Sequence, residues 1–452
     1  MKQKAALAFR LCVFFRSVQD VAATSVKLKR VSCEPSLAEM MMKKLFLPLV
    51  VAMCALPAPA AFAASPAADS SCPDPKNIQD EALREAMGEY ALQYDNLRPV
   101  DGRCPSDTRL VQLALLLDTS NSMDGLINQA KSQLWRIVNE LSRMHKRGGD
   151  IRLQVALYEY GNNDLSPSSG YIRQVTPFTE DLDRISEALF SLDTNGGSEY
   201  CGHVIGSSLN RLRWNRSDEG LKLIYIAGNE PFNQGPVSYE VACRWASERD
   251  IAVNTIYCGD YRVGIDTFWQ RGADVGGGSY FAIDSDRVTR GIATPYDDDL
   301  MKLDKRMNAT YVPYGAHGQE RLARQAEQDA NAARLSAPVA AERAVSKGSK
   351  LYQASDWDLV DAVRQEKLSV DTLDKQYLPD ELQGMSADEL SGYIDGKQKE
   401  RQELKQQIAE LSRKREAYIR EQEEKAVDDE SLGSAILKNL RDQAWTRQFD
   451  VK

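Results

Sequence analysis

Histidine is scarce in this chain, and the common catalytic motifs are missing. The three histidines are His145, His203 and His317, and none belongs to a His-Glu-x-x-His zinc-protease motif. The sequence also lacks the Gly-x-x-x-x-Gly-Lys-Ser/Thr loop of nucleoside triphosphatases and the Gly-x-Ser-x-Gly elbow of many hydrolases. We therefore expect no catalytic residues, and a protein that is not an enzyme.

Long apolar runs are also missing, apart from a short one near the N-terminus. That run has the features of a secretory signal peptide over residues 42–63: a positive start, an apolar core and a small-x-small cleavage site ending at Ala63. We expect export to the periplasm or out of the cell, with an uncleaved membrane anchor as the alternative. Residues 1–41 are expected to be a non-native extension, with the true start at Met41 or Met42.

Cysteine pairs with metal or redox spacing are absent, because no Cys-x-x-Cys occurs. An odd number of cysteines follows the cleavage site, which leaves at least one free thiol or an intermolecular bond. Cys72 and Cys104 flank a short helical segment, and we expect them to pair. The sequence does not decide the state of Cys201, Cys243 and Cys258. The net charge of −9 gives no indication of a nucleic-acid partner.

The central part of the chain alternates apolar strands with amphipathic helices. Residues 64–107 have the composition of a leader with a short helix, and the alternation runs over 108–290. Strands are expected at 109–117, 151–160, 171–175, 221–227, 251–258 and in the segment that ends at Ile283. Helices are expected at about 123–144, 181–192, 200–212, 237–249 and 266–273. This order predicts an α/β fold with a doubly wound, mostly parallel sheet, in which 171–175 is an edge strand.

A cluster of oxygen-bearing side chains follows the first apolar strand. Asp118, Ser120 and Ser122 form Asp-x-Ser-x-Ser directly after five apolar residues in a row. Open α/β sheets place their ligands at the carboxyl ends of the strands. One carboxylate and two hydroxyls are hard ligands that suit Mg²⁺ or Mn²⁺. A simple helix cap is the alternative interpretation, since Asp and Ser are preferred capping residues.

This loop resembles the first metal-binding loop of von Willebrand factor A (VWA) domains, residue for residue. The resemblance covers about 108–290 and implies a VWA/Rossmann-like fold with a metal-ion-dependent adhesion site. It also implies a hydroxyl ligand from a second loop, where Ser198 stands in place of the usual Thr. The third loop departs from the family, because Gly228 occupies the position of its Asp. Asn229, Glu230 or Glu199 could compensate, directly or through water.

The resemblance implies that a carboxylate from a protein partner completes the metal site. Residues on the neighbouring loops would then form the contact surface. We expect the partner-binding residues to be Met123, Glu199, Tyr200 and Phe232.

The C-terminal part is helical and charged. Residues 291–385 favour several short helices, and 386–452 favour one long charged helix and a tail. Apolar residues of the long helix follow three- and four-residue steps, but Lys397, Arg401 and Arg415 share the same seam. A coiled coil is therefore one interpretation, and a helical hairpin packed on the main domain is another. The helices could also mediate homo-oligomerisation.

Together these features predict an exported protein-binding module that uses Mg²⁺ or Mn²⁺ to capture a partner's carboxylate. A metal-free structural protein of the envelope is the first alternative. A metal-dependent hydrolase that uses Asp118, Ser120 and Glu230 is the second.

Overall fold

The computed structural model describes residues 104–284, 291–425 and 432–451, with isolated helical positions between 81 and 89. The predicted signal peptide, its cleavage site near Ala63 and the 1–41 extension lie outside the described residues. Cys104 is disulfide-bonded. The predicted partner Cys72 lies outside the described residues, so this pairing stays a prediction. Within the described ranges, no helix has the length and apolar character needed to cross a membrane.

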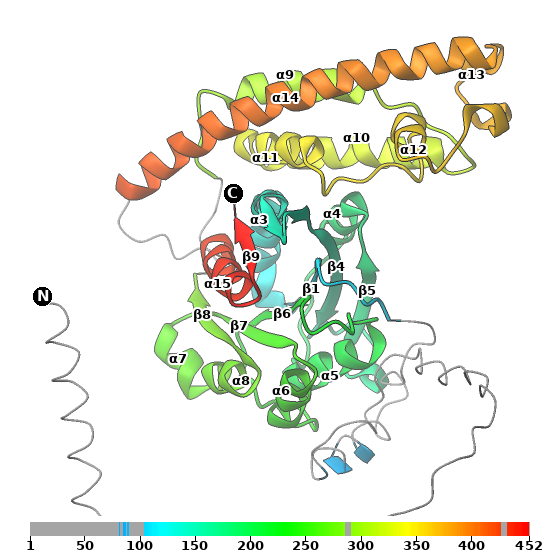
Figure 1. Ribbon diagram of the computed structural model, residues 1–452. Helices are drawn as coiled ribbons and strands as arrows, with labels where there is room; N and C mark the ends of the chain where they lie inside the picture. Colours follow the sequence, from blue (N-terminus) through cyan, green and yellow to red (C-terminus); the bar gives the residue numbers. More distant parts are fainter. Residues whose placement is uncertain are drawn as a thin grey trace, which may run out of the picture. The chain divides into compact units, whose positions relative to one another are not determined.

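A six-stranded sheet forms the centre of the α/β unit (Figure 1). Its order is β5-β4-β1-β6-β7-β8. All neighbours are parallel except β5, which is an antiparallel edge strand. The predicted doubly wound, mostly parallel sheet is therefore confirmed. The strands are β1 (Leu110–Asp118), β4 (Arg152–Tyr160), β5 (Ile172–Thr179), β6 (Leu221–Gly228), β7 (Ala252–Cys258) and β8 (Gly277–Ile283).

Helices cover both faces of the sheet, which explains why its central strands carry apolar residues on both faces. In β1, Leu113, Leu115 and Leu117 belong to one core cluster. Ala114 and Leu116 belong to the other. The first face carries α3 (Asp124–Ser142) and α4 (Leu182–Phe190). The second carries α5 (Cys201–Arg211), α6 (Tyr239–Glu248) and α8 (Trp269–Val275), with α7 (Tyr261–Asp266) beside α8.

The end of the chain returns to this α/β unit, which the sequence did not predict. Helix α15 (Leu432–Thr446) packs beside α3, as the red helix in Figure 1 shows. Its Asn439 accepts a hydrogen bond of 2.6 Å from the hydroxyl of the buried Tyr225. Strand β9 (Phe449–Val451) then pairs antiparallel with β2 (Met144–Lys146), which also pairs with β3 (Gly149–Asp150). The α/β core therefore includes the last residues of the chain.

The helical region lies between β8 and α15 in the sequence. It contains α9 (Asp297–Asn308), α10 (Gly318–Leu335), α11 (Ala337–Gly348), α12 (Leu359–Arg364), α13 (Asp380–Gln383) and α14 (Ala387–Lys425). The predicted helical C-terminal region, including its long helix, is confirmed.

The seam of α14 packs against helices of the same chain. Its buried apolar residues are Leu390, Ile394, Leu404 and Ile408. The charged seam residue Arg401 is bound by Asp358, with an Nη1–Oδ2 distance of 2.5 Å. Arg415 is bound by Asp297 and Glu342. These cations have intrachain carboxylate partners, which explains why they occupy seam positions that a coiled coil would leave apolar.

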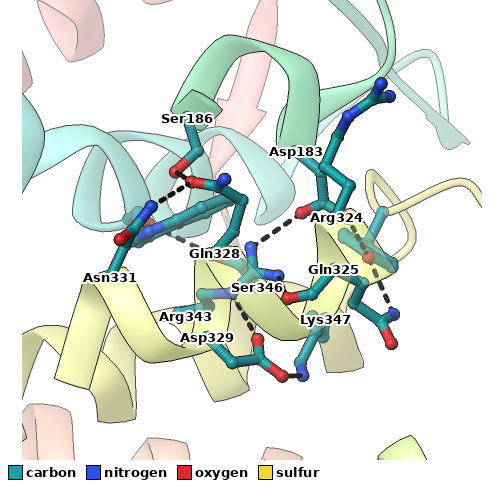
Figure 2. Close-up of polar contacts among 12 residues, drawn as sticks. Asp183, Ser186, Arg324, Gln325, Gln328, Asp329, Asn331, Arg343, Ser346 and Lys347 are labelled. Carbon is teal, nitrogen blue, oxygen red and sulfur yellow. Dashed lines mark hydrogen bonds and ion pairs between the residues drawn. The ribbon is translucent and has the colours of Figure 1, made fainter. Parts of the chain in front are cut away.

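A buried ionic network joins the helical region to α4 of the α/β unit (Figure 2). Arg343 of α11 is 1% exposed and donates hydrogen bonds to Asp183 of α4 at 2.8 Å and to Asp329 of α10 at 2.5 Å. Lys347 is fully buried and donates to Asp329 and Asn308, each at 2.7 Å. Each buried cation has at least two acceptors, which offsets the cost of removing it from water.

We predict that Arg343→Met destabilises the protein by about 3–5 kcal/mol, because it leaves Asp183 buried without its cation and Asp329 with Lys347 alone. Urea-induced unfolding monitored by circular dichroism measures the change. The control is Lys302→Met, whose ammonium pairs with Asp299 on the exposed face of α9 and whose loss should not change stability measurably. Equal stabilities for the two variants would contradict a role for the network in holding the helices.

Candidate functional site

The candidate site is built where β1 ends. Asp118 is the last residue of this strand and is fully buried. Its Oδ1 accepts a hydrogen bond of 2.7 Å from the backbone N–H of Ser120, which closes the turn. The chain then forms a short 3-10 turn over Asn121–Met123 and enters α3 at Asp124.

Parallel pairing brings two further strand ends to the same edge. Asp118 is in register with Tyr160 at the end of β4, and Leu117 with Ala227 near the end of β6. The second predicted loop, 191–200, is tied to the first by a hydrogen bond of 3.0 Å from the Asn195 N–H to the Thr119 carbonyl. The three loops that the sequence analysis singled out therefore meet at one edge of the sheet.

Several oxygens at this edge are buried and lack hydrogen bonds. Asp118 Oδ2, Ser120 Oγ and Asn229 Oδ1 have no partner among the described residues. The other amide atom of Asn229, Nδ2, donates to Ser122 Oγ at 2.9 Å, which links the third loop to the first. A buried polar atom without a partner costs roughly 1–3 kcal/mol, so such atoms in a native protein call for a ligand or water.

The electrostatics of the edge are dominated by carboxylates. Burial, with a smaller contribution from the charge of Glu230, raises the pKa of Asp118 to about 7. Burial also raises the pKa of Glu199 to about 7, with the charges of Asp118 and Glu230 adding to the effect. A second ionised carboxylate in this poorly solvated place is unfavourable, and a cation would relieve the repulsion.

The third loop has no room for a side chain where the VWA pattern has its Asp. A Cβ atom on Gly228 would lie 2.6 Å from the hydroxyl of Tyr160 and 3.0 Å from Asp118 Oδ2. Tyr160 is fixed there because its hydroxyl donates to the Ala227 carbonyl at 2.9 Å. The sequence analysis missed Tyr160 and the neighbouring Gly161, although their place at the end of a buried strand was a usable signal.

The predicted ligands differ in exposure. Ser198 is half-buried on the second loop, and Glu230 is exposed, with Oε2 accepting from Gln234 Nε2 at 3.1 Å. Within the described ranges, no group of three or more His, Cys, Asp or Glu side chains is arranged to hold a metal. The oxygens gathered here include hydroxyls and an amide, and this donor set fits a hard cation such as Mg²⁺ or Mn²⁺.

Two residues predicted at the partner surface lie in the core instead. Phe232 is fully buried and packs against Tyr239 and Trp269, with ring centroids at 5.4 and 4.8 Å. Met123 is 1% exposed, in the core between the sheet and α3. Their apolar side chains pack inside the protein. A sequence pattern cannot distinguish an apolar loop residue that packs inward from one that faces a partner.

The other two predicted surface residues flank each other. Glu199 is only 6% exposed. Tyr200 is half-buried and packs edge-on against Tyr171, with centroids 5.9 Å apart. His203, on the first turn of α5, is buried, and burial lowers its pKa to about 4. Tyr200 is therefore the one residue of the predicted partner set that is partly exposed rather than buried.

We predict that Asp118 makes the metal-free protein less stable as the pH rises. Its pKa of about 7 in the folded protein lies above the ordinary value of 3.8, so its stabilising contribution is complete below about pH 4 and is lost as the pH rises through 7. In chelator, the free energy of unfolding of wild type should fall relative to Asp118→Asn by roughly 4 kcal/mol between pH 4 and pH 8. Urea titrations of both proteins across this range measure it, and a constant difference would contradict the assignment.

We also predict that Gly228→Ala destabilises the protein by about 1–3 kcal/mol through overpacking against the Tyr160 hydroxyl. Tyr160→Phe in the same chain removes that hydroxyl and should recover part of the loss. A double-mutant cycle from urea titrations isolates the interaction. Strictly additive effects would show that the Tyr160 hydroxyl is not what excludes a side chain at position 228.

No family model and no curated protein matches the sequence. Similar solved structures include the hypothetical protein BatB from Bacteroides thetaiotaomicron (18% identity, 38% of this chain and 90% of that chain, TM-score 0.29). They include the VWA domain of SpRpn10 (12% identity, 38% of this chain and 88% of that chain, TM-score 0.30). They also include the vWF domain of the pilus tip protein Mfa5 from Porphyromonas gingivalis (10% identity, 39% of this chain and 91% of that chain, TM-score 0.27). Two of these three names carry the family that the first loop of this chain resembles.

Proposed function

We propose that this protein is an exported, non-enzymatic protein-binding module that holds Mg²⁺ or Mn²⁺ at the Asp118 edge and captures a carboxylate from a partner protein. One observation carries the proposal. Asp118 Oδ2, Ser120 Oγ and Asn229 Oδ1 lack hydrogen bonds in the described structure, although they are buried at the carboxyl edge of a parallel sheet. This edge is where α/β sheets bind ligands.

The cation would be held by Asp118, Ser120 and Ser122 of the first loop, with further donors from the other two loops. Those donors are Ser198, Asn229 and Glu230, acting directly or through water. A hard cation with an open coordination position attracts an anionic oxygen, and a carboxylate of a partner supplies one. The protein residues fix the position of the ion, and the partner completes its shell.

The rim of the edge supports contact with a macromolecule. Asn121 and Ser122 of the first loop and Glu230 of the third loop are exposed. Tyr200, at the end of the second loop, is half-buried. Exposed polar groups around a buried oxygen cluster resemble the polar rim of protein interfaces. Capture through the cation would then provide specificity for an acidic residue on the partner.

A metal-free structural role is the second candidate, and one contact favours it. The Asn229 amide already donates to the hydroxyl of Ser122, so two of the predicted donors tie the loops together without an ion. In that case the edge would be a rigid cap on α3, and the docked helical region would carry the interactions of the protein.

We predict that Mg²⁺ or Mn²⁺ raises the stability of the wild-type protein, and that Asp118→Ala abolishes the effect. A ligand at a hundredfold excess over its dissociation constant stabilises the native state by roughly 2.7 kcal/mol. Thermal unfolding with the divalent ion and with chelator measures the shift. Glu240→Gln is the matched control, since this partly exposed carboxylate on α6 pairs with Arg271 and its loss should leave the shift intact.

A peptide array of acidic and amidated sequence pairs then tests carboxylate capture. Binding of Asp- or Glu-containing peptides that needs the divalent ion and disappears on amidation supports the proposal. A wild-type protein that shows no divalent shift would overturn it and favour the metal-free role.

A further inference from the structure

We infer that Glu199 of the second loop supplies the second carboxylate of the cation site, in place of the Asp that the third loop lacks. The inference rests on the proposed function and names a ligand for it. The sequence analysis expected Glu199 on the partner surface and also named it, with Asn229 and Glu230, as a residue that could compensate for the missing Asp. The contacts of Gly161 and Gly197 favour Glu199 among these three.

Gly161 fixes the neighbourhood of the two carboxylates. The point that a Cβ atom on Gly161 would occupy lies 2.8 Å from Asp118 Oδ1 and 2.8 Å from Glu199 Cγ. Gly161 has a φ of +80°, a conformation that glycine adopts without strain. With no side chain at this position, the side chains of Asp118 and Glu199 both border the space that a Cβ atom on Gly161 would fill.

A second glycine, Gly197, allows the second loop to approach the end of β4. A Cβ atom on Gly197 would lie 2.3 Å from the Gly161 carbonyl oxygen, so only glycine allows this approach of the two backbones. The contact presses the second loop onto the end of β4, two residues before Glu199. The side chain of Glu199 is consequently 6% exposed, although it belongs to a loop.

The third loop offers no equivalent carboxylate. Gly228 faces the Tyr160 hydroxyl and Asp118 Oδ2 at distances that exclude a side chain. The next residue with a carboxylate, Glu230, is exposed, and its Oε2 accepts a hydrogen bond from Gln234. Of the two remaining carboxylates near Asp118, Glu199 is therefore the buried one.

The charges support the same assignment. Asp118 and Glu199 are both buried carboxylates, and Gly161 lies between their loops. Two neighbouring buried carboxylates need a proton or a cation between them. A divalent ion that binds both neutralises their charge, and the bare Oδ2 of Asp118 and Oγ of Ser120 lie at the same turn to complete its shell.

The test uses Mn²⁺ as the probe, with binding measured from the loss of the free-ion signal in electron paramagnetic resonance at pH 8. Glu199→Gln keeps the shape of the side chain and removes its charge, and we expect at least about a tenfold loss of Mn²⁺ affinity. Glu199→Asp keeps the charge but shortens the reach, and it should also weaken binding. Glu240→Gln, a partly exposed carboxylate on α6 that pairs with Arg271, is the matched control and should bind Mn²⁺ like wild type.

Stability in chelator separates folding from binding. Glu199→Gln should be at least as stable as wild type there, since it removes a carboxylate from beside Asp118. If wild type binds Mn²⁺ and Glu199→Gln binds it equally well, the inference is overturned and the proposed function stands. If wild type and all variants fail to bind Mn²⁺, the proposed function and this inference both fail.

Discussion

The burial of the Asp118 carboxylate is the constraint around which the functional edge is organised. Its Oδ1 is used by the turn of its own loop, and its Oδ2 faces the backbone of the third loop at Gly228. Gly161 and Gly197 bring the second loop to the same place. These three glycines come from separate segments of the sequence. Gly161 and Gly228 are required by the space around the Asp118 carboxylate, and Gly197 is required by its close approach to the backbone of Gly161. The edge therefore has little freedom to rearrange around a ligand.

Helix α3 connects this edge to the helical region. It begins directly after the Asp118 turn, and its last turns face α11. Asn139 of α3 accepts a hydrogen bond of 2.7 Å from the hydroxyl of Ser346, and the Arg343 guanidinium lies 4.6 Å from the ring centroid of Trp135. One helix is thus packed on the sheet, bound to the helical region and joined to the candidate site. This arrangement makes the position of the first loop depend on packing far from it.

The sequence was sufficient for the sheet because each central strand is apolar on both faces and each helix has one apolar stripe. It was sufficient for the placement of Asp118, Ser120 and Ser122, since their loop directly follows such a strand. It was insufficient for Phe232, because an apolar loop residue can pack inward or face a partner with the same pattern. It also did not reveal the roles of Gly161 and Tyr160, which depend on contacts between strands far apart in the sequence.

The return of the chain to the α/β unit changes how the helical region is understood. Both ends of this region are attached to the sheet, through β8 before it and α15 after it. The ionic network around Arg343 adds a third attachment, at Asp183 of α4. A segment held at three places loses little additional entropy when it docks, because its ends are already fixed near the surface it binds.

The apolar seam of α14 is buried within the chain by the same docking. Oligomerisation through that seam would require the helices to separate first, at the cost of exposing the seam and the buried cations. The described arrangement therefore favours the helical region as an integral part of the folded chain, and the partner site proposed at the Asp118 edge would need no such separation.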